Sequence, residues 1–329
     1  MATTIAGKPC GRVGFGMISL MHPGRISTED AVEVLKAALE SGSNLWNAGE
    51  HYGTAEYNSL HLIKAYFTKY PEDADKVIVT VKSCLDSRKG LAFVDAESVK
   101  KSIDRCLEIL DGMCRIDVFQ PGRLSHDVPV EETVGAIAEY VNAGRIGGVG
   151  LSECSGESIR KAAAIAPIAL VEVELSLFET GIYHNGVADA CKEHEIPILA
   201  YSPLSRGFLN GQIRKHEDMA KTDYRHFFPR FAKENFDNNV QLVDVADAVA
   251  KQKGCSIVQV ALAWVCQQKD VIGVPVVPIP GTMSIDRLKE NTTEVVLTKE
   301  ELGQLDDVLT NVEIKGARYP ESQQHWLSV

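Results

Sequence analysis

The stretch "KVIVTVK", residues 76–82, is apolar except for one threonine and the two lysines that bound it. A strand that is apolar on both faces is typical of a parallel sheet covered by helices. Seven other short runs are also rich in apolar residues. They are "RVGFGM" (12–17), "NLWNAG" (44–49), "RIDVFQP" (115–121), "GGVGLS" (147–152), "ALVEVEL" (169–175), "IPILAYS" (196–202) and "GVPVVPIPG" (273–281). Together the runs predict eight strands.

Amphipathic segments with helix signals lie between these runs. In segment 27–42, Ser27 is placed as an N-cap, acidic residues follow in the first turn, and Gly42 stops the helix. Segment 95–112 is a second example. Eight strand–helix units predict an α/β protein of the (β/α)8 TIM-barrel class in preference to an open sheet. Because the linkers are short, we expect one domain over residues 1–329.

Three segments lie outside the eight units. Residues 1–11 are expected to form an N-terminal hairpin, and residues 205–238 a long, partly irregular loop after the seventh strand. A C-terminal helix at about 298–309 is followed by a tail that ends in "YPESQQHWLSV". Long insertions after barrel strands lie on the catalytic side, so the loop and the tail are expected to cover the pocket.

Composition and charge exclude several classes of function. Hydrophobic residues make up 45% of the 329 residues and charged residues 24%, as in ordinary soluble proteins. No apolar run approaches the roughly 18 residues of a membrane span, and no signal-peptide pattern opens the chain. The net charge of −11 argues against nucleic acid as a partner. An anionic ligand would therefore require positive charge concentrated locally.

The patterns of cysteine, histidine and glycine residues bear on disulfide bonds, metal sites and nucleotide-binding loops. The eight cysteines form no C-x-x-C pair, which favours reduced thiols and a cytoplasmic location. The nine histidines lack the spacing of metal sites, so we expect no metal. The glycine-rich "GRIGGVG" (144–150) precedes a strand instead of following one, which excludes a Rossmann phosphate loop.

Lys82 ends the third strand, where a barrel interior should be apolar. A buried lysine is costly without a partner or a role. It could form a salt bridge with a loop carboxylate, or it could act on Tyr52, which follows the second strand. An ammonium beside a phenol lowers the phenol's pKa from its usual value of roughly 10. Such a tyrosine can give its proton to a carbonyl oxygen as hydride reaches the carbon.

The segment "PIPGTMSIDRLKEN", residues 278–291, turns from the eighth strand into a helix. Gly281 makes the turn, Thr282 and Ser284 open the helix, and Arg287 follows about one turn later. Backbone amides and hydroxyls at a helix N-terminus bind anions, and barrels bind phosphate in the loops after strands seven and eight. An ordinary Ser/Thr N-cap is the alternative.

These residues together resemble the aldo/keto reductase family over nearly the whole chain. The matching pieces are "GFGM" (14–17), Tyr52–Gly53, Lys82, "GLSE" (150–153), "AYSPLSRGFLNG" (200–211) and residues 278–291. Within the family, "WNAGEHYG" (46–53), "VEVELSLF" (171–178) and the final "LSV" are similar to the fungal pyridoxal reductases. The resemblance implies an NADP-dependent oxidoreductase that reduces a small aldehyde. Pyridoxal, reduced to pyridoxine in vitamin B6 metabolism, is the expected substrate.

The resemblance also implies catalytic roles. Tyr52 matches the family's general acid, and Lys82 matches its lysine partner. The usual Asp on the second strand is Asn47 here, and the usual His after the fourth strand is Gly122. We therefore expect Lys82 to lack its neutralising partner, so that its charge acts more fully on Tyr52 or its own pKa falls. Asn47 is expected to orient its surroundings, and Gly122, with Trp46, to line an enlarged substrate pocket.

NADPH is the cofactor that the resemblance implies. Ser152, Glu153 and Glu172 match positions near the carboxamide, where the family usually has Asn and Gln at the second and third. Met283 replaces a basic residue found in many relatives, which weakens the expected preference for NADPH over NADH. The full set of expected cofactor residues is Gly16, Met17, Ser152, Glu153, Glu172, Tyr201 (stacked on the nicotinamide), Ser202, Leu204 and Arg206 (near the pyrophosphate), Gly281, Thr282, Ser284 and Arg287 (at the 2′-phosphate), and Glu290 and Asn291 (at the adenine).

Two other functions remain open at this point. Lys82 could attack a carbonyl as the nucleophile of a Schiff-base enzyme. The chain could instead be a non-enzymatic, NADPH-bound regulatory subunit, as some members of this family resemble channel partners. In the enzymatic reading the partner is a small-molecule aldehyde, with neither nucleic acid nor membrane. The sequence does not predict an oligomeric state.

Overall fold

The computed structural model describes residues 3–86, 90–324, 326–327 and 329. An eight-stranded parallel sheet runs in chain order, so that each strand pairs with the next one. Each strand falls within or overlaps one of the predicted apolar runs. The strands are β3 (Phe15–Gly16), β4 (Leu45–Gly49), β5 (Ile78–Ser83), β8 (Val118–Pro121), β9 (Val149–Ser152), β10 (Ile168–Glu174), β11 (Ile198–Tyr201) and β12 (Val276–Pro278).

The first and last strands of this sheet meet and close it. Gly14 N donates to Pro278 O at 2.9 Å, and Gly16 N donates to Pro280 O at 3.2 Å. A Cβ on Gly16 would lie 2.7 Å from Ile279 O, so only glycine permits this approach. The predicted (β/α)8 barrel is confirmed.

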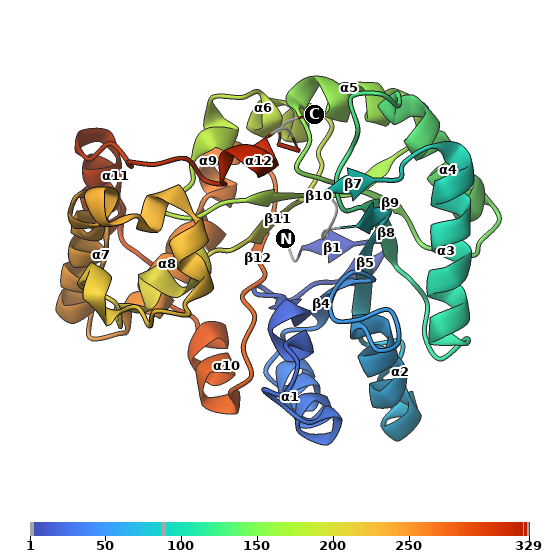
Figure 1. The fold of residues 1–329 in the computed structure, drawn as a ribbon, viewed down its shortest axis with the longest axis horizontal. Coiled ribbons are helices and arrows are strands. Elements are labelled where there is room, and N and C mark those ends of the chain that lie inside the picture. The colour runs from blue at the N-terminus through green and yellow to red at the C-terminus, as the bar shows by residue number, and fades with distance from the viewer. Residues whose placement is uncertain (1–2, 87–89, 325, 328) are drawn as a thin grey trace.

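Helices surround the barrel, as Figure 1 shows. Ser27 caps α1 through its side chain, which accepts a hydrogen bond from Asp30 N at 3.0 Å, and Gly42 follows the helix end with φ 79°, as predicted. The helices that follow the strands are α1 (Thr28–Glu40), α2 (Ser59–Lys69), α3 (Ala96–Leu110), α4 (Val130–Asn142), α5 (Gly156–Ile165), α6 (Val187–Glu193), α7 (Lys233–Lys253), α8 (Ile257–Gln267), α9 (Lys269–Ile272) and α10 (Ile285–Thr292). Two more, α11 (Lys299–Asn311) and α12 (Glu321–Gln324), belong to the C-terminal segment.

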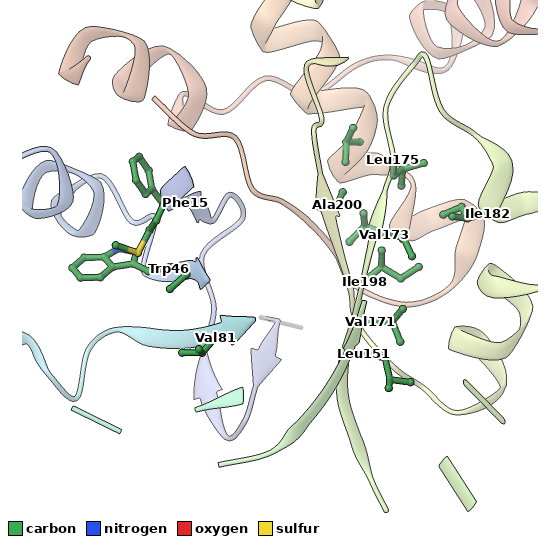
Figure 2. Close-up of a cluster of buried hydrophobic side chains, with 14 of the residues drawn as sticks. Phe15, Trp46, Val81, Leu151, Val171, Val173, Leu175, Ile182, Ile198 and Ala200 are labelled. Carbon is green, nitrogen blue, oxygen red and sulfur yellow. The ribbon is translucent and has the colours of Figure 1, made fainter. Parts of the chain in front are cut away.

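The main hydrophobic core lies between the strands and the helices. Figure 2 shows Phe15 and Trp46, neighbours on β3 and β4, in this layer. Trp46 is fully buried against α2, edge-on to Tyr66 at 4.7 Å and stacked on Phe67 at 5.9 Å between ring centroids. The expectation that Trp46 lines the substrate pocket is therefore wrong. Its side chain faces the helices.

A second, smaller core plugs the barrel interior. The hairpin of β1 (Thr4–Ile5) and β2 (Lys8–Pro9), predicted for the N-terminus, adds Ile5 to this plug. The barrel strands contribute Leu45, Ile78, Val118, Leu170, Leu199 and Val277. Two residues further along four of these strands, on the same face, the side chains become polar: Asn47, Thr80, Gln120 and Glu172. The interior thus changes from an apolar floor to a polar layer toward the carboxyl ends of the strands.

The segments outside the eight units also follow the prediction in outline. The loop after β11 is built from short 3-10 turns, η4 (Ser205–Asn210), η5 (His216–Asp218), η6 (Tyr224–Phe227) and η7 (Pro229–Phe231), and it ends where α7 begins at Lys233. The helix predicted at about 298–309 is α11. A short antiparallel pair, β6 (Leu85–Asp86) and β7 (Leu91–Ala92), was not predicted. The remaining 3-10 turns are η1 (Met17–Met21), η2 (Pro71–Asp73) and η3 (Gly181–Tyr183).

Candidate functional site

A buried ionic group, here called the lysine cluster, occupies the polar layer inside the barrel. It consists of Lys82, Glu172, Asn47, Gln120 and Thr80. Lys82 Nζ lies 2.6 Å from Glu172 Oε1 and 2.9 Å from Oε2, and it also donates to Asn47 Oδ1. Asn47 Nδ2 donates to Glu172 Oε2 at 2.7 Å and to Thr80 Oγ1 at 3.1 Å. Gln120 Nε2 donates to Glu172 Oε2 at 2.5 Å.

The expectation that Lys82 lacks a neutralising partner is wrong. Glu172 supplies the carboxylate from β10, on the far side of the interior from Asn47 on β4 in strand order. The departures expected at positions 47 and 172 are therefore linked, because a carboxylate absent at position 47 is present at position 172. Both oxygens of Glu172 are engaged by this cluster. Its expected contact with the nicotinamide carboxamide stays a prediction.

Burial and charge act in opposite directions on Lys82, which is 4% exposed. Burial lowers the pKa of Lys82, but the nearby Glu172 carboxylate and Tyr52 raise it, and the pKa is raised overall. The alternative of a lowered lysine pKa is therefore wrong. Lys82 is an ammonium ion held between a carboxylate and an amide oxygen.

Tyr52 lies at the mouth of the barrel beside the lysine cluster. It follows β4, its backbone N donates to Gly49 O at 3.0 Å, and its half-buried ring lies 5.3 Å from Lys82 Nζ, measured to the ring centroid. Burial raises the pKa of Tyr52, Lys82 opposes this, and Glu172 adds to it, so the pKa is raised overall. The expected lowering toward neutral pH is wrong, and the phenol keeps its proton.

Gly122 follows β8, and its backbone N donates to Ser83 O at 2.7 Å. A Cβ at this position would lie 3.1 Å from Leu85 Cβ and 3.4 Å from His51 Cε1. These neighbours occupy part of the room that a larger residue would need. The expected enlargement of the pocket is thus reduced by the side chains of Leu85 and His51.

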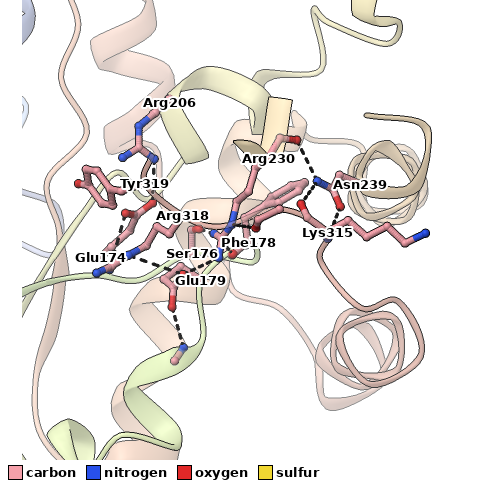
Figure 3. A network of polar contacts seen from close by, with 12 residues as sticks. Glu174, Ser176, Phe178, Glu179, Arg206, Arg230, Asn239, Lys315, Arg318 and Tyr319 are labelled. Atoms are coloured by element: carbon pink, nitrogen blue, oxygen red, sulfur yellow. Dashed lines mark hydrogen bonds and ion pairs between the residues drawn. The ribbon is translucent and has the colours of Figure 1, made fainter. Parts of the chain in front are cut away.

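A second ionic group, here called the arginine cluster, consists of Glu153, Glu174, Arg206 and Arg318. Figure 3 shows Arg206 and Arg318 on either side of Glu174. Arg206 Nη1 lies 3.2 Å from Glu174 Oε1, and Arg318 Nη1 lies 3.8 Å from Glu174 Oε2. Arg318 also forms a two-pronged ion pair with Glu153, with Nη1 3.2 Å from Oε1.

The C-terminal tail supplies part of the arginine cluster. Tyr319, next to Arg318, has its hydroxyl 3.0 Å from the hydroxyl of Tyr201, and its ring lies 4.9 Å from the Arg206 guanidinium. The tail also docks on the loop after β9, where Ser155 N donates to Val329 O at 2.8 Å. Three expected cofactor residues, Glu153, Tyr201 and Arg206, therefore contact the tail. Arg318 and Tyr319 were not expected at the site, because no spacing signal in the sequence marks them.

A cavity of about 230 Å³ borders the arginine cluster. Its lining includes Glu153, Val173, Glu179, Ile182 and Arg318, whereas Tyr52 and Lys82 do not contribute to it. The cavity therefore lies apart from the lysine cluster.

The loop after β12 has the predicted geometry. Thr282 Oγ1 accepts a hydrogen bond from Ser284 N at 3.1 Å, and Ser284 caps α10 by accepting one from Arg287 N at 3.4 Å. Arg287 is exposed and has no ion-pair partner in the described part of the chain. Glu290 and Asn291 lie on the same helix. The arrangement fits both an N-cap and an anion site.

The other expected cofactor residues are distributed around the barrel mouth. Ser152 Oγ is buried and has no hydrogen-bond partner among the described residues. Glu153, Ser202 and Arg206 adopt left-handed backbone conformations, with φ of 52°, 49° and 53°. Such strained residues gather at functional sites. Of the remaining positions, Leu204 is half-buried, and the backbones of Gly16 and Gly281 approach each other closely. The side chain of Met17 lies in the core.

The described residues contain no group of three or more His, Cys, Asp or Glu that could hold a metal ion. In the described part of the chain, no helix is both long and apolar enough to cross a membrane.

Comparison with known proteins agrees with the barrel. Residues 12–310 match the model of the aldo/keto reductase family. The chain is 36% identical to a probable pyridoxal reductase of Schizosaccharomyces pombe over 99% of both chains. It is 33% identical to an NADP(+) aldo-keto reductase of the same yeast, over 94% of this chain and 91% of that one. A glycerol dehydrogenase of Gluconobacter oxydans superposes with a TM-score of 0.82 at 24% identity, over 96% of this chain and 97% of the other. The chain belongs to the aldo/keto reductase family of oxidoreductases.

Proposed function

We propose that this protein reduces small aldehydes to alcohols with NADPH, and that pyridoxal, reduced to pyridoxine, is a substrate. The observation that carries the proposal is the position of the Tyr52 phenol, 5.3 Å from ring centroid to Lys82 Nζ, beside the buried Lys82–Glu172 pair at the barrel mouth. The identity to a probable pyridoxal reductase supports the choice of substrate. The NADP(+) named for a second relative supports the choice of cofactor. A cytoplasmic location and a single domain over residues 1–329 are part of the proposal.

The residues around the mouth fit a nicotinamide dinucleotide. Ser152 Oγ, which is buried without a hydrogen-bond partner among the described residues, suits a carboxamide. The exposed Arg287 beyond the capped start of α10 suits a 2′-phosphate. Tyr201 would lie against the nicotinamide, and Ser202, Leu204 and Arg206 would lie near the pyrophosphate. Gly16, Gly281, Thr282, Ser284, Glu290 and Asn291 would complete the site. When bound, the reduced cofactor supplies the hydride.

Residues of the chain supply the proton that the carbonyl oxygen receives. Tyr52 gives its hydroxyl proton to the carbonyl oxygen as the carbonyl carbon accepts hydride, so the C=O π bond breaks and C–H and O–H bonds form. The Lys82 ammonium stabilises the phenolate left behind, which then regains a proton from solvent. Glu172 keeps Lys82 charged, and Asn47 fixes the position of both.

The Schiff-base alternative has less support. A nucleophilic lysine must be a neutral amine with a free lone pair. Lys82 instead donates to Glu172 and Asn47 and has a raised pKa. Sodium borohydride trapping with substrate in the absence of nicotinamide tests this point, because a stable adduct on Lys82 would favour that alternative.

The proposed function is tested by following NADPH oxidation with a panel of pyridoxal, simple aromatic aldehydes and ketones. We expect aldehydes to be reduced to alcohols identified by mass spectrometry, with pyridoxal among the better substrates. A protein that binds NADPH tightly but oxidises it with no member of the panel would contradict the proposal. That result would favour the regulatory-subunit alternative.

A further inference from the structure

Arg123 follows Gly122 directly after β8 and is half-buried. Its Nη1 donates to Gly122 O at 2.7 Å, whereas its Nε is buried without a hydrogen-bond partner among residues of known placement. Arg206, Arg230 and Arg318 each pair with a glutamate. Arg123 forms no ion pair within the described part of the chain. Because a buried charge is costly when unpaired, this guanidinium is suited to a ligand that carries the missing negative charge.

The surroundings of Arg123 connect it to the catalytic centre. Its neighbour Gly122 is bonded to Ser83 O, one residue beyond Lys82, and faces the ring of His51. The His51 ring packs edge-on against Tyr52, with 4.7 Å between centroids. His51 Nδ1, like Arg123 Nε, is buried without a partner in the described residues. Two unsatisfied nitrogens therefore lie in residues grouped around Gly122, next to the proposed proton donor.

The charge balance at this place is positive. Lys82 is neutralised by Glu172. Glu153 acts electrostatically on Arg123 but is paired with Arg318, so among the described residues no carboxylate forms an ion pair with Arg123. Burial and the cations Lys82 and Arg123 lower the pKa of His51 to about 3, so its ring is neutral and provides one N–H donor. In a protein of net charge −11, this is the local positive site that an anionic ligand requires.

We propose that Arg123, assisted by His51, binds an anionic oxygen of the substrate. This inference rests on the proposed function and names its substrate class, which is small aldehydes that also carry a carboxylate, phosphate or ionised hydroxyl. The guanidinium neutralises the substituent and holds the aldehyde toward Tyr52. Pyridoxal, a ring aldehyde with an acidic ring hydroxyl, belongs to this class.

The kinetic test compares each carboxybenzaldehyde isomer with its uncharged methyl ester. We expect the wild-type protein to prefer at least one carboxylate isomer. Arg123→Met should lower kcat/KM for that isomer by about 10- to 100-fold, as expected for a lost charged hydrogen bond, and leave its ester unchanged. Arg123→Lys should retain part of the preference. Equal losses for the carboxylate and its ester would overturn the inference.

Two further variants test whether the preference depends on the position of Arg123. Arg115 precedes β8, at the opposite end of this strand from Arg123, so the control Arg115→Met should leave the carboxylate preference intact. His51→Phe keeps a ring against Gly122 and Tyr52 but removes both nitrogens, and it should reduce the preference less than Arg123→Met. Melting temperatures of the variants identify any loss that comes from folding.

A binding measurement distinguishes failure of this inference from failure of the proposed function. Calorimetric titration with benzoate and with its neutral isostere benzamide requires no turnover. We expect the wild-type protein to bind benzoate more tightly, and Arg123→Met to remove the difference. If benzoate binding depends on Arg123 but no aldehyde is reduced, the anion site stands and the proposed function fails. If aldehydes are reduced but benzoate and benzamide bind alike, the anion site is refuted.

Discussion

The lysine cluster and the arginine cluster lie at the same end of the barrel but are built differently. Every member of the lysine cluster lies on a barrel strand, β4, β5, β8 or β10. The arginine cluster combines β10 with the residue after β9, the loop after β11 and the C-terminal tail. Strand positions are set by the closed hydrogen-bonded ring, whereas the tail must dock separately. In the proposed function, the proton chemistry therefore depends on preformed residues, whereas part of the proposed cofactor site depends on a docked segment.

The largest expected effect on activity comes from changing Tyr52, which lies beside the lysine cluster. Tyr52→Phe keeps the ring but removes the proton, so kcat should fall by about 10²–10⁴ while NADPH binding is unchanged. Lys82→Met should cause a similar loss, and the double variant should be scarcely worse than either single one, because the pair acts as a unit. Steady-state kinetics and NADPH fluorescence titration measure both quantities. Retention of near-full aldehyde reduction by Tyr52→Phe would refute the proposed mechanism.

Breaking the lysine cluster should also have a large effect on stability. Glu172→Gln leaves the Lys82 ammonium buried without a counter-ion, and breaking such a pair costs about 3–5 kcal/mol of unfolding free energy. Urea denaturation measures the change. Glu193→Gln, which removes an exposed partner of Arg160, is the matched control and should leave stability unchanged. A Glu172→Gln protein as stable as the control would show that the pair is not needed for the fold.

The arginine cluster should respond more weakly in activity. Arg318→Ala leaves the buried Glu153 carboxylate without this partner, so the expected cost in unfolding free energy is again about 3–5 kcal/mol. The rate of hydride transfer, followed in a single turnover with saturating NADPH, should stay close to that of the wild-type protein. A loss of rate as large as that of Tyr52→Phe would mean that the tail belongs to the proton chemistry and that the contrast between the clusters is false.

The smallest of these effects concerns an exposed side chain. Arg287→Ala should weaken NADPH binding about tenfold and leave NADH binding unchanged, since only NADPH carries the 2′-phosphate with which Arg287 is proposed to pair. Dissociation constants from fluorescence titration give the comparison. Equal weakening of both cofactors would show that Arg287 does not read the 2′-phosphate.

Much of the fold could be predicted because it depends on local patterns. Apolar runs marked all eight strands, and Ser27 and Gly42 marked the limits of α1. The side chain of Trp46 was assigned to the wrong face of its strand, although the alternation of side chains along a strand predicts the correct face. Successive side chains of a strand face opposite sides, so Trp46 and Asn47 cannot both face the interior.

The features that could not be predicted depend on contacts between residues that lie far apart in the sequence. Lys82 and Glu172 are 90 residues apart, and they meet because β5 and β10 place their side chains in the same polar layer. The raised pKa of Tyr52 reflects burial, which sequence alone does not give. Arg318 and Tyr319 reach the site only because the C-terminal tail docks there, which no local sequence pattern predicts.

Glu172, in place of an acid at position 47, supplies the carboxylate that Lys82 requires. The most direct measurement compares kcat and unfolding free energy for Asn47→Asp, Glu172→Gln and the double variant. Asn47→Asp alone places a second carboxylate against Glu172, where Asn47 Nδ2 now donates at 2.7 Å, and Glu172→Gln alone leaves Lys82 unpaired. We predict that both single variants lose activity and stability and that the double variant recovers most of each. Losses that simply add in the double variant would contradict the claim.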